Sequence, residues 1–364
     1  MQAKQSLRFS RKDSKKFFKT LNQRVNNYFK KNKIKKTGNW KLYLKTLVMF
    51  SILIAPYCLV FTLDINLWYK LPLCILMGIG MAGVGMNVMH DGNHGSFSKH
   101  SWINELMGSS IYILAGNVFN WKVQHNLLHH TYTNIHGHDE DLEAGKILRF
   151  SRHMKWFPHH KFQHFYSVFL YGLLTINWAF FADFQQMKRY TAQKLSYLNS
   201  KSPSLQWIGL IITKILYFSI WLIIPIIFLD APWWAIIIGF IAMHYTAGLI
   251  LSLVFQLAHV IEGAEMPKPD NSGTMKNTWA IHQLLTTVNF STKNSFINWF
   301  TGGLNHQIEH HIFPNISHIH YNKIGMIVKK TAQEFNLPYN EYKTTRSALF
   351  SHFRFLKQMG VQPS

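Results

Sequence analysis

Residues 71–94 read LPLCILMGIGMAGVGMNVMHDGNH, an apolar stretch that ends in two histidines four positions apart. A membrane-crossing helix needs about 20 consecutive, mostly apolar residues, and the part from 71 to 89 meets this requirement. His90 and His94 would lie on one face of a helix with their Cβ atoms about 5–6 Å apart, a spacing that suits joint metal binding. The stretch therefore predicts a transmembrane helix with a pair of metal ligands at one end.

Three further segments, at about 44–63, 205–229 and 233–258, are also long and apolar enough to cross a bilayer. Residues 64–70 join the first two spans and Asp230-Ala231-Pro232 joins the last two, which predicts two tight hairpins. These turns carry a single Lys between them, whereas the N-terminal, middle and C-terminal segments are rich in Lys and Arg. The positive-inside rule therefore places those three segments in the cytoplasm.

The net charge of +22 for 364 residues has two ordinary explanations, nucleic-acid binding and cytoplasmic segments that face anionic lipids. Because apolar spans adjoin the basic N-terminal stretch, we favour the membrane explanation and expect no nucleic-acid partner.

Cys58 and Cys74 both lie in apolar stretches, which argues against a disulfide framework or a thiolate metal site. Two weaker apolar stretches, 107–119 and 165–181, are expected to be interfacial or partly buried helices.

Most of the 21 histidines fall into tight groups, and none precedes His90. Residues 125–130 read HNLLHH and residues 306–311 read HQIEHH. One such pair is commonly a surface or core feature, but three groups on one side of a membrane protein predict a shared metal centre. Imidazole suits zinc, copper and iron alike, whereas a zinc site takes only three or four ligands and this chain offers more. Two irons that activate O2 are the best chemical fit.

The order and placement of the three groups resemble the membrane fatty-acid desaturase family over roughly residues 40–323. Residues 302–314, GGLNHQIEHHIFP, resemble the front-end branch, in which Gln replaces the first His of the third box; residues 121–134 are similar too. The resemblance implies an enzyme of lipid metabolism that uses two iron ions (Fe2+/Fe3+), O2 and an external electron donor. Such an enzyme inserts a cis double bond into an acyl chain on the carboxyl side of an existing one.

The resemblance also implies the metal ligands, including a histidine at the cytoplasmic end of the fourth span. They are His90, His94, His125, His129, His130, His259, Gln307, His310 and His311. His306 is the alternative to Gln307, which stands where many desaturases have a ligating His. Residues that could orient the imidazoles through hydrogen bonds, or simply solvate this surface, are Asp91, Asn93, Asn126, Asn305 and Glu309. No catalytic side chain beyond the ligands is expected.

Other polar residues receive plainer interpretations. His244 precedes His259 by fifteen residues, about 22 Å along a helix, and is expected to be a buried structural residue. The acidic run from Asp139 to Asp141 is expected to be a solvated loop, with a structural role as the minor alternative because the run lies just past the second box. Histidines expected to contact lipid headgroups are His153, His159, His160 and His164, and those expected to flank the boxes without binding metal are His136, His138, His318 and His320.

The predicted fold is an all-α integral membrane protein, with four transmembrane helices as two hairpins and a cytoplasmic helical cap that holds a di-iron site. Its parts are a basic N-terminal segment (1–40), a desaturase domain (41–323) and a C-terminal tail (324–364). The cytoplasmic His-box regions are expected at 90–204 and 259–323. The expected location is a bacterial inner membrane, with the protein multi-pass and both termini cytoplasmic.

The expected substrate is an acyl-CoA or an acyl-lipid in the membrane. A fused cytochrome b5 module is not expected, because the first 89 residues lack histidine and the tail beyond His320 contains only His352. Electrons would then come from a separate donor, ferredoxin or cytochrome b5 with its reductase, and the basic cytoplasmic surface would suit an acidic donor, lipid phosphates or a CoA moiety.

Three alternatives stay open at this point. A hydroxylase, ketolase or sphingolipid desaturase would use the same kind of di-iron centre. A metal transporter or sensor would need ionisable residues deep within the spans, where only Lys214 and His244 occur. A purely structural membrane scaffold would leave three aligned histidine groups unexplained.

Overall fold

The computed structural model describes residues 7–11, 16–195 and 202–361, and most of the residues in these ranges lie in helices. It divides into two compact units. Unit 1 comprises residues 1–37, 124–166 and 254–364, and unit 2 comprises residues 38–123 and 167–253. Four helices are long and apolar enough to cross a membrane, at Trp40–Thr62, Leu67–Asn93, Pro203–Phe228 and Trp233–His259. The predicted helical membrane fold with four spans is thereby confirmed.

The first two spans begin earlier than the hydropathy pattern predicts, at Trp40 and Leu67 rather than near 44 and 71. Asn39 and Asn66 cause this, since their side chains accept hydrogen bonds from the backbone N–H groups of Lys41 and Trp68. Such N-caps satisfy donors that the first helical turn leaves open. The first turns of both helices contain polar and aromatic residues, so a pattern based on apolar residues alone places the helix starts too late.

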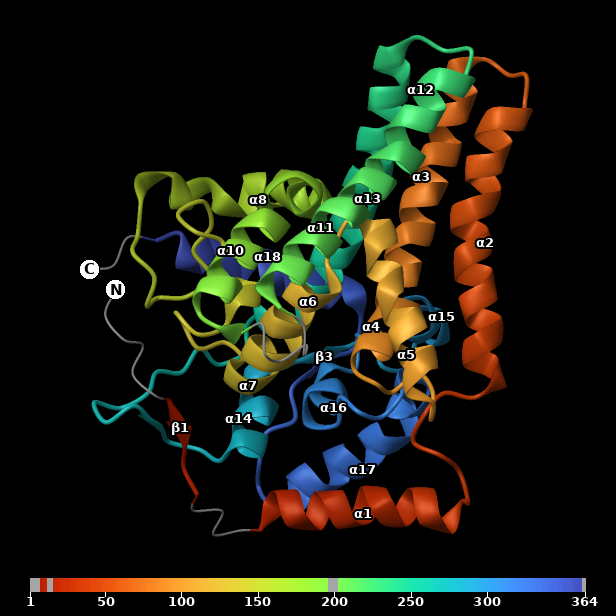
Figure 1. Cartoon of the computed structure of the whole chain (residues 1–364). Coiled ribbons are helices and arrows are strands. Elements are labelled where there is room, and N and C mark those ends of the chain that lie inside the picture. Colours follow the sequence, from red (N-terminus) through yellow and green to blue (C-terminus); the bar gives the residue numbers. More distant parts are fainter. Residues whose placement is uncertain (1–6, 12–15, 196–201, 362–364) are drawn as a thin grey trace. The chain divides into compact units, whose positions relative to one another are not determined.

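Unit 2 contains α2 (Trp40–Thr62) and α3 (Leu67–Val84), which Figure 1 shows side by side. A Cβ atom on Gly80 of α3 would lie 2.6 Å from the backbone nitrogen of Leu53 in α2. A Cβ atom on Gly78 would collide with the carbonyl oxygen of Met243 in α13 (Trp233–His259). Small residues at these two positions let the helix backbones approach closely, which is how helices commonly associate within membranes.

The spans are continued and connected by shorter helices. α3 passes through the π-helical turn η1 (Gly85–Met89) into α4 (His90–Asn93), and the third span consists of α11 (Pro203–Phe218), η8 (Ser219–Ile223) and α12 (Ile224–Phe228). Further elements are α5 (Ser101–Gly108), η2 (Ser109–Leu114), α6 (Val118–Trp121), η3 (Lys122–His129), α7 (His130–Tyr132), η4 (Glu140–Leu142), η5 (Pro158–Phe162), α8 (Gln163–Gly172), α9 (Leu174–Asn177), η6 (Trp178–Ala182) and α10 (Asp183–Ala192). The segments Pro158–Gly172 and Leu174–Ala192 meet at 60° and together are apolar enough to form one more, broken span.

A buried polar cluster lies among the helices of unit 2. Lys214 of α11 forms an ion pair with Asp183 of α10, with 2.7 Å between Nζ and Oδ2, and Asn120 Nδ2 donates to Asp183 Oδ1. Both ring nitrogens of His244 are engaged, Nδ1 with Thr175 Oγ1 at 2.8 Å and Nε2 with the hydroxyl of Tyr217. The prediction that His244 is buried is confirmed, because it is fully inaccessible to solvent.

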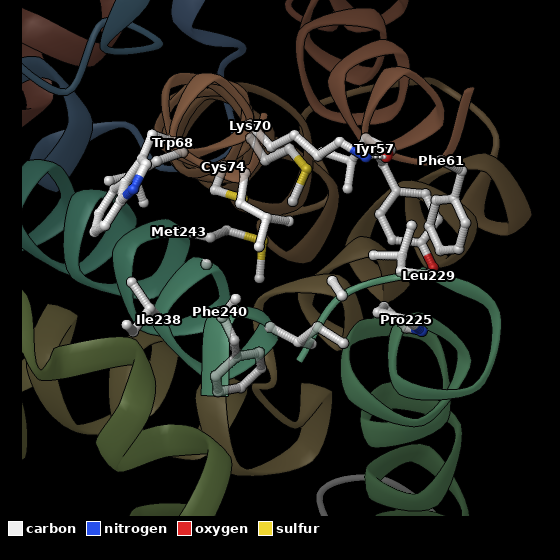
Figure 2. Close-up of a pocket in the computed structure, with 18 of the residues that line it drawn as sticks. Tyr57, Phe61, Trp68, Lys70, Cys74, Pro225, Leu229, Ile238, Phe240 and Met243 are labelled. Carbon is white, nitrogen blue, oxygen red and sulfur yellow. Dashed lines mark hydrogen bonds between the residues drawn. The ribbon is translucent and has the colours of Figure 1, made fainter. Parts of the chain in front are cut away.

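A largely apolar cavity of about 230 Å³ also lies in unit 2, between residues of α2, α3, α12 and α13 (Figure 2). Its polar member Lys70 donates from Nζ to the carbonyl oxygen of Val60. On α3 the lining extends only to Met77, thirteen residues before His90. This separation corresponds to about 20 Å along a helix, so the cavity lies well away from the first histidine pair.

Unit 1 is built from α1 (Phe17–Lys31), α14 (Trp279–Thr286), α15 (Ser295–Phe300), α16 (Gln307–Ile312), η9 (His318–His320), α17 (Tyr321–Glu334) and α18 (Thr345–Met359). Two-residue strands pair in parallel, β1 (Arg8–Phe9) with β2 (Thr274–Met275) and β3 (Asn289–Phe290) with β4 (Glu341–Tyr342). The apolar faces of α1, α14, α16 and α17 form one buried cluster. This cluster supports α16, the helix that carries the third histidine group.

Candidate metal centre

Six of the predicted histidine ligands lie in unit 1 and come from four elements. His125 and His129 lie on the π-helical segment η3, His130 begins α7, His259 ends α13, and His310 and His311 lie on α16. All six are buried, with at most 8% of any of them exposed. A buried imidazole needs partners that compensate for its lost contact with water. Six buried imidazoles in one unit therefore need a common partner.

Five of the six imidazoles form two groups that could each hold a metal ion. One ring nitrogen from each of His129, His259 and His311 lies within 4.8 Å of the others, and the same holds for His130, His310 and His311. In the first group the ring centroids are 4.7–4.8 Å apart. Because His311 belongs to both groups, the two candidate positions are neighbours.

Two carboxylates orient the second histidine group. The Nδ1 atom of His129 lies 3.0 Å from both carboxylate oxygens of Asp139, and Nδ1 of His125 lies 2.7 Å from Oδ2 of Asp141. Backbone N–H groups of Asn134 and Asp141 in turn donate to Asp139. With Nδ1–H donating to a carboxylate, Nε2 is the nitrogen that would bind a metal, as is usual for metal-binding histidines.

The acidic run is therefore not the solvated loop that the sequence predicts. Asp139 is 2% exposed, and the side chain of Asp141 is 12% exposed. The prediction is wrong because the segment folds back onto η3 and exchanges water for two imidazoles and backbone N–H groups. The available signal was the position of the run, directly after the second histidine group.

Two neutral side chains orient the third group. The Nδ1 atom of His310 lies 3.1 Å from the hydroxyl of Tyr321, and Nδ1 of His311 lies 2.9 Å from Oε1 of Gln283. Gln283 also donates from Nε2 to the carbonyl oxygen of His130, so it links the second and third groups. The sequence gives no sign of either contact, since Gln283 and Tyr321 lie outside the three boxes.

The two carboxylates both raise the pKa of their partner histidine, but the net shifts of His125 and His129 have opposite directions. Burial lowers the pKa of His125, and the hydrogen bond and charge of Asp141 offset this only in part. For His129, burial acts in the same direction, but the charge and hydrogen bond of Asp139 outweigh it and the pKa is raised. Burial raises the pKa of Asp141, yet its hydrogen bond and charge interactions with His125 and His129 bring it below its ordinary value.

The donor atoms fit a metal ion. Among the described residues, Nε2 of His129 and both ring nitrogens of His259 are buried and have no hydrogen-bond partner, and the same is true of Oε1 of Gln307. Such buried unsatisfied atoms are rare in proteins and require an explanation. Convergent imidazoles with anchored Nδ1 atoms supply one, because imidazole nitrogens bind iron, zinc or copper.

The first histidine pair lies in unit 2. The ring centroids of His90 and His94 are 4.6 Å apart, and both rings contact the indole of Trp121, at 5.7 and 5.6 Å. His90 is 6% exposed. The close approach of the two rings is in keeping with the predicted helical spacing.

Two of the residues expected to orient the imidazoles, Asn305 and Asn93, form hydrogen bonds with groups that are not ligands. Asn305 bonds to Phe290 O, Asn298 Oδ1 and Thr301 Oγ1, which corrects its predicted contact with a ligand: it fixes the loop before α16 instead. Asn93 donates to Gly108 O. Asp91 is buried, and Asn126 lies on η3 between two predicted ligands.

Glu309 accepts hydrogen bonds from Asn289 Nδ2 and the hydroxyl of Tyr339, and one of its oxygens lies 3.6 Å from Nδ1 of His306. Its partners therefore place it beside His306, the alternative ligand. The contacts among Asn289, Tyr339, His306 and Glu309 fix the start of α16.

The expected headgroup surface is corrected for His160, which is 1% exposed. Its Nδ1 accepts from the backbone N–H of Phe157, and its Nε2 lies 3.0 Å from the carbonyl oxygen of Lys146. His153 likewise bonds to the carbonyl oxygen of Met266. These histidines connect backbone segments within unit 1.

Residues 66–343 match the fatty acid desaturase family, and the chain belongs to that family. It is 40% identical to an sn-1 linoleoyl-lipid 6-desaturase of Arthrospira platensis, over 95% of this chain and 93% of the relative. A protein of the same name from Synechocystis sp. is 35% identical over 94% of this chain and 95% of its own length. An acyl-lipid (8-3)-desaturase of Physcomitrium patens is 32% identical over 98% of this chain and 74% of the relative.

The predicted enzyme class is thereby confirmed. The protein is an oxidoreductase of lipid metabolism, a fatty acid desaturase with membrane-spanning character and clustered histidines that could hold metal. The alternatives of a metal transporter and of a structural scaffold are set aside.

Proposed function

We propose that this chain is an O2-dependent front-end acyl-lipid desaturase. Its reaction would insert a cis double bond at carbon 6 of a linoleoyl chain esterified to a membrane glycerolipid, on the carboxyl side of the existing double bonds. Support for the position comes from the two relatives named sn-1 linoleoyl-lipid 6-desaturase, which match nearly the whole chain. The observation that carries the chemistry is the buried double group of imidazoles that share His311.

The proposed cofactor is a pair of iron ions held by the ligand set that the three histidine boxes imply. The set is His90, His94, His125, His129, His130, His259, Gln307, His310 and His311. When bound, the irons would activate O2 to remove hydrogen from an unactivated acyl carbon, a step beyond any protein side chain. The chain contributes ligands, their orientation and a dry environment.

The protein's own residues would perform that positioning as follows. Asp139 and Asp141 hold the Nδ1 protons of His129 and His125, which fixes both the tautomer and the ring orientation. Tyr321 and Gln283 do the same for His310 and His311. All of the proposed ligands except the half-buried His94 are buried, which limits the access of water to the site.

Gln307 is the proposed ninth ligand in preference to His306. The Oε1 atom of Gln307 is buried and has no hydrogen-bond partner among the described residues, as expected for an atom that would bind metal directly or through water. Both ring nitrogens of His306 are likewise buried without a hydrogen-bond partner among the described residues, but Nδ1 of His306 lies 3.6 Å from a carboxylate oxygen of Glu309. The preference for Gln307 therefore rests on this neighbouring carboxylate and on the box alignment. A Gln307→Ala variant would lose iron if the proposal holds, whereas His306→Ala would retain it.

The proposed topology places the N-terminal segment, the histidine boxes and the C-terminal tail in the cytoplasm of a bacterial inner membrane. Support comes from the Lys and Arg residues of these segments, set against hairpin turns that carry a single Lys. The proposed domain limits stay at 1–40, 41–323 and 324–364. Electrons would arrive from a separate ferredoxin, or from cytochrome b5 with its reductase.

The test is to express the chain in a bacterial host supplied with linoleic acid and to locate double bonds in its lipids by mass spectrometry. A new bond at carbon 6 on a glycerolipid, absent with His310→Ala, is the expected result. A new double bond at carbon 5 or 8 would support front-end desaturation but reject carbon 6 as its position. A hydroxylated or keto product made by iron-loaded protein would reject desaturation.

A further inference from the structure

Exposed lysines gather on two adjacent helices of unit 1, α1 and α17. We name this surface the α1–α17 basic face; its exposed cations are Lys16, Lys19, Lys30, Lys31, Lys33, Lys35, Lys323 and Lys330. Residues 16–36 contain no acidic residue. In the described part of the chain, the carboxylates recorded in ion pairs here are Glu334, bound to Arg24, and Glu341, bound to Lys329.

The two helices are fixed to each other and to the core. Arg24 of α1 donates from Nη1 to Thr331 Oγ1 of α17 and pairs with Glu334 at 2.6 Å. Figure 1 shows α1 and α17 as neighbours. The basic face is therefore a rigid surface with lysines on both helices, and not a flexible charged tail.

The packing of α1 argues for a soluble acidic partner and against the bilayer surface. A helix that lies on a membrane buries its apolar face in lipid. The apolar residues of α1 are already buried in the protein core: Phe17, Leu21, Val25 and Phe29. Among the described residues of α1, α17 and the segment after α1, the exposed large apolar side chains are Ile34 and Met326, and no aromatic anchor is among them.

The basic face also lies directly behind the third histidine group. Tyr321 is the first residue of α17, and its hydroxyl lies 3.1 Å from Nδ1 of His310. Further along, a Cβ atom on Gly325 would lie 3.3 Å from the carboxyl carbon of Glu309 on α16. Only small residues permit this approach, so the lysine-bearing helix and the ligand-bearing helix are in direct contact.

We infer that the α1–α17 basic face docks an acidic one-electron carrier protein. This inference rests on the proposed desaturase function. One double bond consumes one O2, two electrons and two protons in addition to the two hydrogens of the acyl chain, and forms two waters. The carrier must therefore bind and leave twice per turnover, which favours an electrostatic interface that forms quickly.

The experiment uses the full-length enzyme in zwitterionic lipid nanodiscs, with a plant-type acidic [2Fe–2S] ferredoxin and its reductase as donor. The test variant carries Lys19→Glu, Lys30→Glu, Lys323→Glu and Lys330→Glu. The matched control carries Lys276→Glu, Lys293→Glu, Lys343→Glu and Arg346→Glu, four exposed cations of unit 1 outside the basic face. A second test variant with Gln at the same four positions provides a milder change should charge reversal prevent folding.

Each variant is assayed with ferredoxin and with a small chemical reductant, and product is measured for both. We expect the KM for ferredoxin to rise at least about tenfold in the reversed variant at low salt, and less in the Gln variant. The ratio of ferredoxin-driven to chemically driven product should fall accordingly. The wild-type rate should decrease with rising salt, because screening weakens exposed charge pairs.

Three results would overturn the docking inference: an unchanged ferredoxin KM, an equal rise in the control, or an effect confined to nanodiscs with anionic lipid. The last would assign the basic face to the bilayer. Absence of any desaturated product from the wild-type enzyme with the chemical reductant would instead reject the proposed function. The two failures are thus distinguishable.

Discussion

Two fully buried histidines, His129 in unit 1 and His244 in unit 2, have opposite environments. His129 bonds to Asp139 through Nδ1, while its Nε2 has no hydrogen-bond partner among the described residues. His244 bonds through both nitrogens, to Thr175 and to Tyr217. Burial alone therefore does not identify a metal ligand. The distinguishing feature is one anchored nitrogen and one that converges on other imidazoles.

The same contrast separates the two polar clusters that contain them. In unit 2, the ion pair of Lys214 and Asp183 is supplemented by Asn120 Nδ2 and by a backbone carbonyl, so each charge of that cluster is compensated within the protein. In unit 1, the carboxylates of Asp139 and Asp141 satisfy only the outer sides of their imidazoles. We interpret the first cluster as a support for the helices and the second as a binding site that needs a cation.

The largest expected effect is the loss of a ligand. His129→Ala should lower product formation by more than about 100-fold, because even the loss of an outer partner of a ligand costs roughly 10–100-fold. Iron content per protein, measured by mass spectrometry of the purified membrane enzyme, should fall with it.

The matched control is His244→Gln. It should retain its iron and lose only about 1–3 kcal/mol of stability, the cost of an imperfectly satisfied buried polar group. Equal iron contents in the two variants would abolish the distinction drawn between the two histidines.

The next largest effect concerns the buried ion pair. Lys214→Met should reduce the free energy of unfolding by about 3–5 kcal/mol, because it leaves Asp183 as an uncompensated buried charge. The double variant Lys214→Met/Asp183→Leu should recover most of that loss. Unfolding in detergent, followed by tryptophan fluorescence, measures both. If the double variant is as unstable as the single variant, the uncompensated charge of Asp183 is not the cause of the lost stability.

A pH effect is expected from His352, a buried histidine outside the metal groups. Burial lowers its pKa from 6.5 to about 4, against the opposing hydrogen bond to the carbonyl oxygen of Val260. The folded state therefore holds a neutral ring, and the unfolded state takes up a proton first as the pH falls. Stability present above pH 6.5 is lost progressively down to about pH 4, by roughly 3 kcal/mol at 1.36 kcal/mol per pH unit.

Melting temperatures at pH 7.0 and 4.5 test this effect, with His352→Gln as the comparison. The variant should show a smaller decrease on acidification than the unaltered protein. Identical decreases would mean that other groups, such as the ligating imidazoles, carry the whole acid sensitivity.

The smallest of these effects concerns an outer partner of the metal centre. Asp139→Asn keeps the size of the side chain but removes its charge, so iron affinity should fall roughly 10–100-fold. Competition with a chelator measures the change. A loss similar to that of His129→Ala would mean that Asp139 itself binds metal, and no loss would remove it from the positioning role.

The sequence by itself determined the membrane spans and the ligand candidates. Spans depend on about 20 consecutive apolar residues, and box motifs depend on spacing within one turn, so both are local. The roles of Gly78 and Gly80 are not local and could not be predicted in this way. Only the packed structure shows that these two glycines of α3 meet the backbones of α13 and α2.

The tertiary structure alone decided which polar residues serve the metal centre. Gln283 lies 28 residues from His311, and only the fold of unit 1 brings them to 2.9 Å. The acidic residues 139–141 read as a solvated loop because composition describes exposure on average, whereas the folded chain compensates their burial with imidazoles and backbone N–H groups. Local patterns specify helices and ligand spacing, but the partners of a buried polar atom depend on contacts between distant segments.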